Sequence, residues 1–136
     1  FEQQQKVVSL TAYKVLSIEL AAGLGHTFYD NETDYETVYF DQEIQHDFAS
    51  WVSGDSMEPL YPNGSVALMK QTGFDYDGAV YALIWNGKTY IKKVYREAEG
   101  LRLESINPDY DDLFAPYEDE PKIVGIVVGH FLPLEV

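Results

Sequence analysis

A β-hairpin signal near the middle of the chain constrains the fold more than any other feature. Residues 79–85 are strongly strand-forming, and residues 88–95 have the pattern of a return strand. Between them lies Asn86-Gly87, the favoured pair of a two-residue type I′ turn. We therefore predict two antiparallel strands joined by this turn.

Other segments extend the same pattern. Strands are also predicted at residues 36–40, 48–53, 65–70, 101–106 and 122–132, and short strand-like or extended segments at 7–10 and 15–20. Turn-rich segments at 61–64 and 107–121 separate some of them. Many short strands without a convincing amphipathic helix predict an all-β fold, arranged as a partly open barrel. The 136 residues contain no internal repeat and suffice for one domain.

Composition narrows the classes of function. The formal net charge of -14 argues against DNA binding by this chain alone, because phosphate contacts require Lys and Arg. The chain lacks cysteine, which excludes disulfides and thiolate metal sites and fits a reducing compartment. No apolar run is long enough for a membrane span, and no signal peptide is visible. Because the chain begins at Phe1, we expect a fragment of a longer protein.

The sequence gives little support for a metal site or a cofactor. The acidic residues between 30 and 43 and between 109 and 120 do not follow EF-hand spacing, and we interpret them as solvated loops. His26, His46 and His130 are scattered without a metal or triad motif. We predict no metal and no cofactor.

A serine on a tight turn is the first candidate for chemistry. The apolar strand that ends near Trp51 breaks at Gly54, so Ser56 is expected just beyond a strand end. There its hydroxyl would project, and neighbouring backbone N–H groups could stabilise an oxyanion. Gly-Asp-Ser is equally an ordinary turn composition, so this stretch alone does not decide between the two interpretations.

A lysine within the hairpin supplies a candidate base. Lys92 and Lys93 lie between Ile91 and Val94, and strand alternation directs the two lysines to opposite faces. Burial would lower the pKa of the lysine that faces inward. From a reference pKa of about 10.4, keeping lysine neutral at pH 7 costs roughly 4.6 kcal/mol. A neutral lysine can deprotonate a serine, but the pattern does not choose between the two.

These two motifs together resemble the LexA-type self-cleaving repressor family, which includes LexA, the lambda-like phage repressors and the UmuD proteins. The resemblance rests on Val52-Ser-Gly-Asp-Ser-Met-Glu-Pro59, followed 36 residues after Ser56 by Ile91-Lys-Lys-Val94. The segment 106–110 (Ile-Asn-Pro-Asp-Tyr) is also similar to a loop in this family. The resemblance covers the chain from about Leu20 onward and implies the family's mainly β C-terminal domain.

The resemblance also implies roles for individual residues. Ser56 would be the nucleophile and Lys92 the general base. The backbone N–H groups of Asp55 and Ser56 would form the oxyanion hole.

A cleavage site is implied as well. Members of the family cut themselves at Ala-Gly or Cys-Gly, and Ala22-Gly23 lies 34 residues before Ser56. Leu20 and Ala21 would be recognised ahead of the cut. Without the resemblance, this small-residue stretch would pass for an ordinary linker.

At the level of the whole protein, the resemblance implies a cytoplasmic transcriptional repressor. Residues 1–35 would be a linker and cleavage segment packed on the domain, and residues 36–136 the Ser-Lys peptidase and dimerisation domain. An N-terminal helix-turn-helix domain, absent here, would bind operator DNA. The partners would be a second copy of the chain and, in an SOS response, RecA filament acting as a co-protease. No interaction with a membrane is expected. We take residues 122–132 and the tail as the dimer surface, on the view that they form an apolar edge strand.

Two alternatives remain. A type I signal peptidase shares a Ser-Met-x-Pro motif and a strand lysine, but it requires a membrane anchor and a larger apolar substrate surface. A repressor domain kept only for dimerisation would have the same composition, yet it would need neither Ser56, Lys92 nor Ala22-Gly23.

Overall fold

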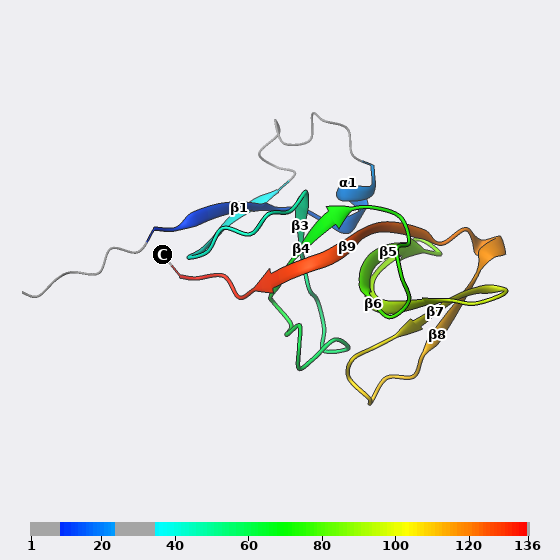
Figure 1. The fold of residues 1–136 in the computed structure, drawn as a ribbon. Coiled ribbons are helices and arrows are strands. Elements are labelled where there is room, and N and C mark those ends of the chain that lie inside the picture. The colour runs from blue at the N-terminus through cyan, green and yellow to red at the C-terminus, as the bar shows by residue number, and fades with distance from the viewer. Residues whose placement is uncertain (1–8, 24–34, 136) are drawn as a thin grey trace, which may run out of the picture.

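The computed structural model describes residues 9–23 and 35–135, and its fold is mainly β, as predicted (Figure 1). Within these residues one nine-stranded mixed sheet has the order β2-β1-β3-β4-β9-β5-β6-β7-β8. The two end strands, β2 and β8, do not pair with each other, so the sheet does not close into a barrel. The elements are β1 (Thr11–Val15), α1 (Ile18–Ala22), β2 (Glu36–Phe40), β3 (Phe48–Trp51), β4 (Val66–Gln71), β5 (Val80–Trp85), β6 (Lys88–Arg96), β7 (Gly100–Glu104), β8 (Leu113–Pro116), the 3-10 helix η3 (Tyr117–Asp119) and β9 (Lys122–Phe131).

The predicted hairpin is confirmed, with its turn as expected and its strand bounds within one residue of the prediction. Strands β5 and β6 are antiparallel, and Trp85 pairs with Lys88 across the turn. Asn86 and Gly87 have φ of 52° and 74°, the positive values that a type I′ turn requires. Asparagine and glycine adopt such values most readily. The local sequence therefore sets the register that determines which residues of β6 face inward.

Strand β9 crosses the centre of the sheet (Figure 1). Its residues 122–126 pair with β5, and residues 125–131 pair with β4. The prediction of an edge strand at 122–132 is therefore wrong, because the edges are β2 and β8. Its apolar run is only partly buried, because Val124 and Phe131 lie in the core whereas Val128 is 42% exposed.

Two further segments differ from the predictions. Residues 18–22 form one helical turn instead of an extended segment, with Ser17 as its N-cap. Leu and Ala in that turn have high helix propensity, and the cap satisfies an N–H at the helix start. The segment 107–121, predicted as a loop, contains β8 and η3. The predicted segment 7–10 lies partly outside the described residues.

Three groups of buried residues form the core, and one of them lies beneath the Ser56 turn. That group joins Val52 and Met57, on either side of the turn, to Ile91 of β6. Ile18 and Ala21 attach α1 to the same group. The turn after β3, the strand β6 and the helix α1 are therefore held against one another by a shared apolar cluster.

Candidate active site

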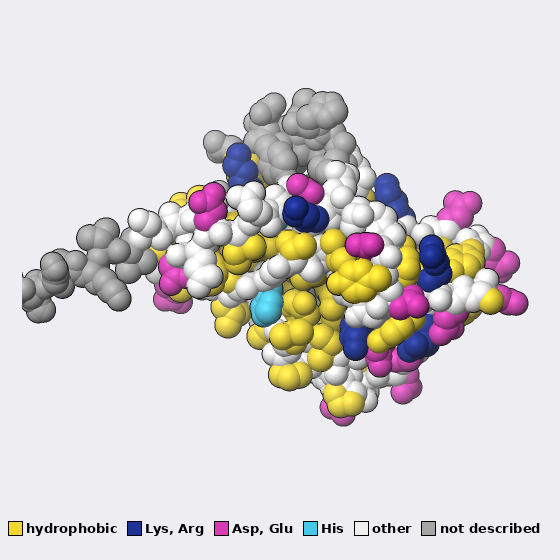
Figure 2. Space-filling view, in the orientation of Figure 1, with side chains coloured by type: hydrophobic (Ala, Val, Ile, Leu, Met, Phe, Trp, Pro, Cys, Tyr) yellow, Lys and Arg dark blue, Asp and Glu magenta, His cyan; other side chains and the backbone are white. Residues whose placement is uncertain are grey.

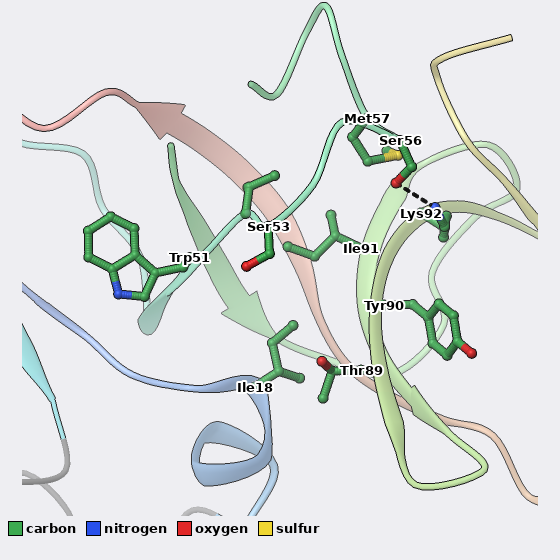
Figure 3. A pocket seen from close by; sticks show the side chains of 10 residues that line it. Ile18, Trp51, Ser53, Ser56, Met57, Thr89, Tyr90, Ile91 and Lys92 are labelled. Atoms are coloured by element: carbon green, nitrogen blue, oxygen red, sulfur yellow. Dashed lines mark hydrogen bonds between the residues drawn. The ribbon is translucent and has the colours of Figure 1, made fainter. Parts of the chain in front are cut away.

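The candidate nucleophile lies on the turn that follows β3. Gly54 has φ of 83°, a conformation that favours glycine, and its N–H donates to Asn63 Oδ1 at 2.7 Å. The chain then turns through Asp55 and Ser56 before the buried side chain of Met57 anchors it to the core. The Ser56 side chain is half-buried and faces the strand β6 (Figure 3).

The two lysines of β6 have opposite environments. Lys92 is buried, with 7% of its surface exposed, and it pairs with Tyr81 of β5. The Lys93 side chain is 34% exposed, and its Nζ lies 3.5 Å from Glu104 Oε1. Strand geometry thus resolves the choice that the sequence pattern left open, and Lys92 is the lysine on the Ser56 side.

The amine of Lys92 lies in direct contact with the serine. Its Nζ is 2.7 Å from Ser56 Oγ (Figure 3) and 2.8 Å from Ser105 Oγ. Burial lowers the pKa of Lys92 below its ordinary value, because the ammonium is poorly solvated there. A serine hydroxyl beside an amine of lowered pKa is the arrangement required for Ser-Lys nucleophilic catalysis.

Residues 14–128 match the family model described as Peptidase S24-like. The chain belongs to the S24 peptidase family. The S24 match covers both the Ser56 turn and the Lys92 strand.

Curated relatives agree with this assignment. Repressor protein CI of Enterobacteria phage phi80 is 42% identical over 77 residues, which are 55% of this chain and 32% of that protein. The LexA repressor of Citrifermentans bemidjiense is 33% identical over 86 residues, 62% of this chain and 43% of that protein. The LexA repressor of Lacticaseibacillus casei is 30% identical over 118 residues, 84% of this chain and 55% of that protein. The S24 chain therefore spans about half or less of these relatives.

The backbone beside the nucleophile offers two donors to an oxyanion. In the described part of the S24 domain, the N–H groups of Asp55 and Ser56 donate to no other protein group. The Asp55 carbonyl, by contrast, accepts from Glu58 N–H at 3.1 Å and closes the turn. Two adjacent free N–H groups next to a nucleophile can bind the charge that develops on an attacked carbonyl oxygen.

The segment 105–110 packs against both halves of the S24 site. Asn107 N–H donates to the Ser56 carbonyl at 2.9 Å, and Asn107 Nδ2 donates to the Asp55 carbonyl at 3.0 Å. The Tyr110 hydroxyl donates to the Asp55 carboxylate, which raises the pKa of Tyr110. Sequence reasoning noted this loop only as a resemblance and missed Ser105, although Ser105 directly follows an alternating strand.

Ser56 and Lys92, the candidate catalytic dyad, both line a cleft that could receive a peptide (Figure 3). One wall comes from the segment around the nucleophile, another from β6, and Ile18 of α1 closes one side. Polar and apolar side chains both contribute to the surface. The lining residues are Ile18, Trp51, Val52, Ser53, Ser56, Met57, Thr89, Tyr90, Ile91 and Lys92.

The predicted cleavage segment is not in this cleft. Ala22 and Gly23 lie at the end of α1, and neither lines the cleft with Ser56. Ala21 is fully buried, and the Ala22 carbonyl accepts from Lys122 Nζ at 3.3 Å. The structure thus brings Ser56 and Lys92 together but keeps Ala22-Gly23 at the C-terminal end of α1, outside the site.

The remaining residues considered from the sequence have other roles or lie outside the described ranges. His46 contacts the carbonyl of Ile44 through Nδ1 at 2.7 Å, and the His130 ring packs edge-on against Tyr61. His26 lies outside the described residues. In the described ranges no group of three or more His, Asp or Glu side chains could hold a metal ion. None of the helices described there is long and apolar enough to cross a membrane.

Proposed function

We propose that this S24 domain cuts its own Ala22–Gly23 bond, with Ser56 as nucleophile and Lys92 as general base. The observation that carries the proposal is the 2.7 Å contact between Lys92 Nζ and Ser56 Oγ in a buried setting. Membership of the S24 family supports it further. A domain kept only for dimerisation would not need a buried amine against that hydroxyl, because burial of an amine opposes folding.

The proposed reaction has two steps. Neutral Lys92 takes the Ser56 hydroxyl proton while Oγ attacks the Ala22 carbonyl carbon, and the Asp55 and Ser56 N–H groups bind the oxyanion. The C–N bond then breaks, the proton passes from Lys92 to the Gly23 amine, and an Ala22–Ser56 ester remains. In the second step Lys92 activates a water that hydrolyses the ester, which restores the serine hydroxyl. Attachment of the substrate to the same chain gives the attack a high effective molarity.

The helix α1 must unwind before this reaction can begin. A helical backbone turns its carbonyls into its own hydrogen bonds, as Ser17 and Glu19 do with Ala21 and Gly23 N–H at 3.1 Å. The attack requires an exposed, extended bond within reach of Ser56. The cleavage rate is therefore set by two populations, the extended segment and the neutral amine.

For the longer protein we propose a transcriptional repressor that cleavage inactivates. Phage phi80 CI and the LexA relatives carry the name repressor, and this chain covers only part of each. An N-terminal DNA-binding domain would contact the operator, since the charge of -14 disfavours DNA contact here. Residues 1–35 would carry the cleavage segment and contribute β1 to the sheet. Residues 36–136 would form the peptidase and dimerisation domain. Cytoplasmic location and stimulation by RecA filament in an SOS response belong to the same proposal.

The proposed dimer surface lies on the second half of β9 and the tail. Residues 127–131 have β4 as their strand partner, whereas the β5 pairing stops at Ile126. Val128, Leu132 and Leu134 are 42%, 55% and 37% exposed. Apolar side chains gather on this face of the molecule (Figure 2). A second copy could cover that apolar surface.

Mass spectrometry of the purified chain tests the proposal. After incubation near pH 7 and near pH 10, with and without RecA filament, we expect fragments Phe1–Ala22 and Gly23–Val136, formed faster at the higher pH. Ser56→Ala and Lys92→Ala should abolish both fragments. Lys93→Ala is the matched control on the opposite face of β6 and should cut like the parent. An intact mass under every condition would contradict self-cleavage and favour the dimerisation module.

A further inference from the structure

A second hydroxyl contacts the amine of Lys92, and the reaction described above gives it no role. Ser105 Oγ lies 2.8 Å from Lys92 Nζ, which also lies 2.7 Å from Ser56 Oγ. Ser105 and Lys92 are 9% and 7% exposed, so bulk water has little access to either group. In the described part of the chain, Lys92 is the only side chain that hydrogen-bonds to Ser105.

The chemistry of a neutral amine gives this contact a consequence. A neutral lysine has two N–H donors and one lone pair, and it acts as a base only when the lone pair points at the serine proton. Rotation about the Cε–Nζ bond exchanges these three positions. An acceptor at Ser105 Oγ takes one N–H and leaves the lone pair free to face Ser56 Oγ.

The position of Ser105 in the fold strengthens this argument. Ser105 directly follows β7, which pairs with β6 through Lys93 and Glu104. Two residues later, Asn107 donates to the carbonyls of Ser56 and Asp55 at 2.9 and 3.0 Å. One short segment thus holds the base on one side and the nucleophile turn on the other, which sets the distance between the reacting atoms.

We propose that Ser105 is a positioning residue that orients the amine of Lys92 toward Ser56. This inference rests on the proposed self-cleavage, since orientation matters only if Lys92 acts as a base. Ser105 touches neither the scissile bond nor the attacked carbonyl in this scheme. Misplacement of a catalytic group by about 1 Å can lower a rate by about 100-fold, so we expect Ser105→Ala to slow cleavage by about 10- to 100-fold.

The test measures self-cleavage against pH for Ser105→Ala, Ser105→Thr and the control Ser65→Ala. Ser65 is a fully buried serine whose Oγ donates to the Pro62 carbonyl at 2.7 Å, away from the cleft. We expect Ser105→Ala to lower the high-pH plateau, where Lys92 is neutral in every variant. Ser105→Thr should restore most of the rate because it returns the hydroxyl, and Ser65→Ala should keep the parental rate. An unchanged plateau in Ser105→Ala would overturn the proposal.

A second measurement does not depend on cleavage. In the Ser56→Ala background, which cannot form the ester, NMR relaxation at Lys92 Cε reports the order of the side chain. Adding Ser105→Ala should reduce that order, and adding Ser65→Ala should not. Unchanged order would overturn the positioning role even if the parent chain cuts itself. Reduced order in a chain that never cuts would refute self-cleavage and leave the Ser105 contact established.

Discussion

Removal of the cap at the start of α1 is expected to accelerate self-cleavage. Ser17 Oγ accepts a hydrogen bond from Leu20 N–H at 3.1 Å and so stabilises the first turn of a five-residue helix. This helix competes with the extended conformation in which Ala22 can reach Ser56. Ser17 is exposed and does not line the cleft, so Ser17→Ala leaves the dyad in place.

The expected size of the effect follows from the value of a cap. Replacing serine by alanine at an N-cap destabilises a helix by about 1 kcal/mol. Few other hydrogen bonds hold α1, chiefly two backbone bonds of 3.1 Å and the 3.3 Å bond from Lys122 to Ala22, and Ser17→Ala leaves the core packing of Ile18 and Ala21 unchanged. If the extended state is rare, its population and the cleavage rate rise together. A change of about 1 kcal/mol then corresponds to roughly fivefold faster cleavage.

A time course by mass spectrometry can measure this difference. Ser17→Asp is the matched control, because aspartate also caps helices, and it should cut within about twofold of the parent. Ser17→Ala should cut roughly fivefold faster, with the same two fragments and the same dependence on Ser56. Equal rates for the Ala and Asp variants, or slower cleavage by Ser17→Ala, would refute the idea that unwinding of α1 limits the reaction.

Two other predictions concern the base and the core. Burial lowers the pKa of Lys92 below its ordinary value, and only the neutral amine accepts a proton. The cleavage rate should therefore rise with pH, with the midpoint of the rise below pH 10.5. A flat rate from about pH 7 to about pH 10 would contradict this. Gly125→Ala would place a Cβ 2.7 Å from the Lys70 carbonyl oxygen and 3.0 Å from Phe48 Cζ, and should lower the free energy of unfolding by about 1–3 kcal/mol. An unchanged urea midpoint would show that the sheet tolerates the methyl group.

Where local chemistry dominates, the sequence is sufficient to predict the structure. Asn86-Gly87 specifies the hairpin, because few other residue pairs adopt two successive positive φ values. Segments whose structure depends on a distant partner were predicted less well. Residues 113–116 form a strand only through pairing with β7, and residues 122–131 change from a supposed edge to the centre of the sheet.

The candidate site divides in the same way. The motifs identify Ser56 and a lysine 36 residues later, since a resemblance in sequence needs no coordinates. Alternation alone directs Lys92 and Lys93 to opposite faces but does not say which face is buried, because burial depends on the neighbouring strands. Only the tertiary structure places Lys92 at 2.7 Å from Ser56, adds Ser105 beside it, and keeps Ala22 in a helix outside the cleft. Residue type and local periodicity are properties of the chain itself, whereas distances across a sheet arise only when separate segments pack together.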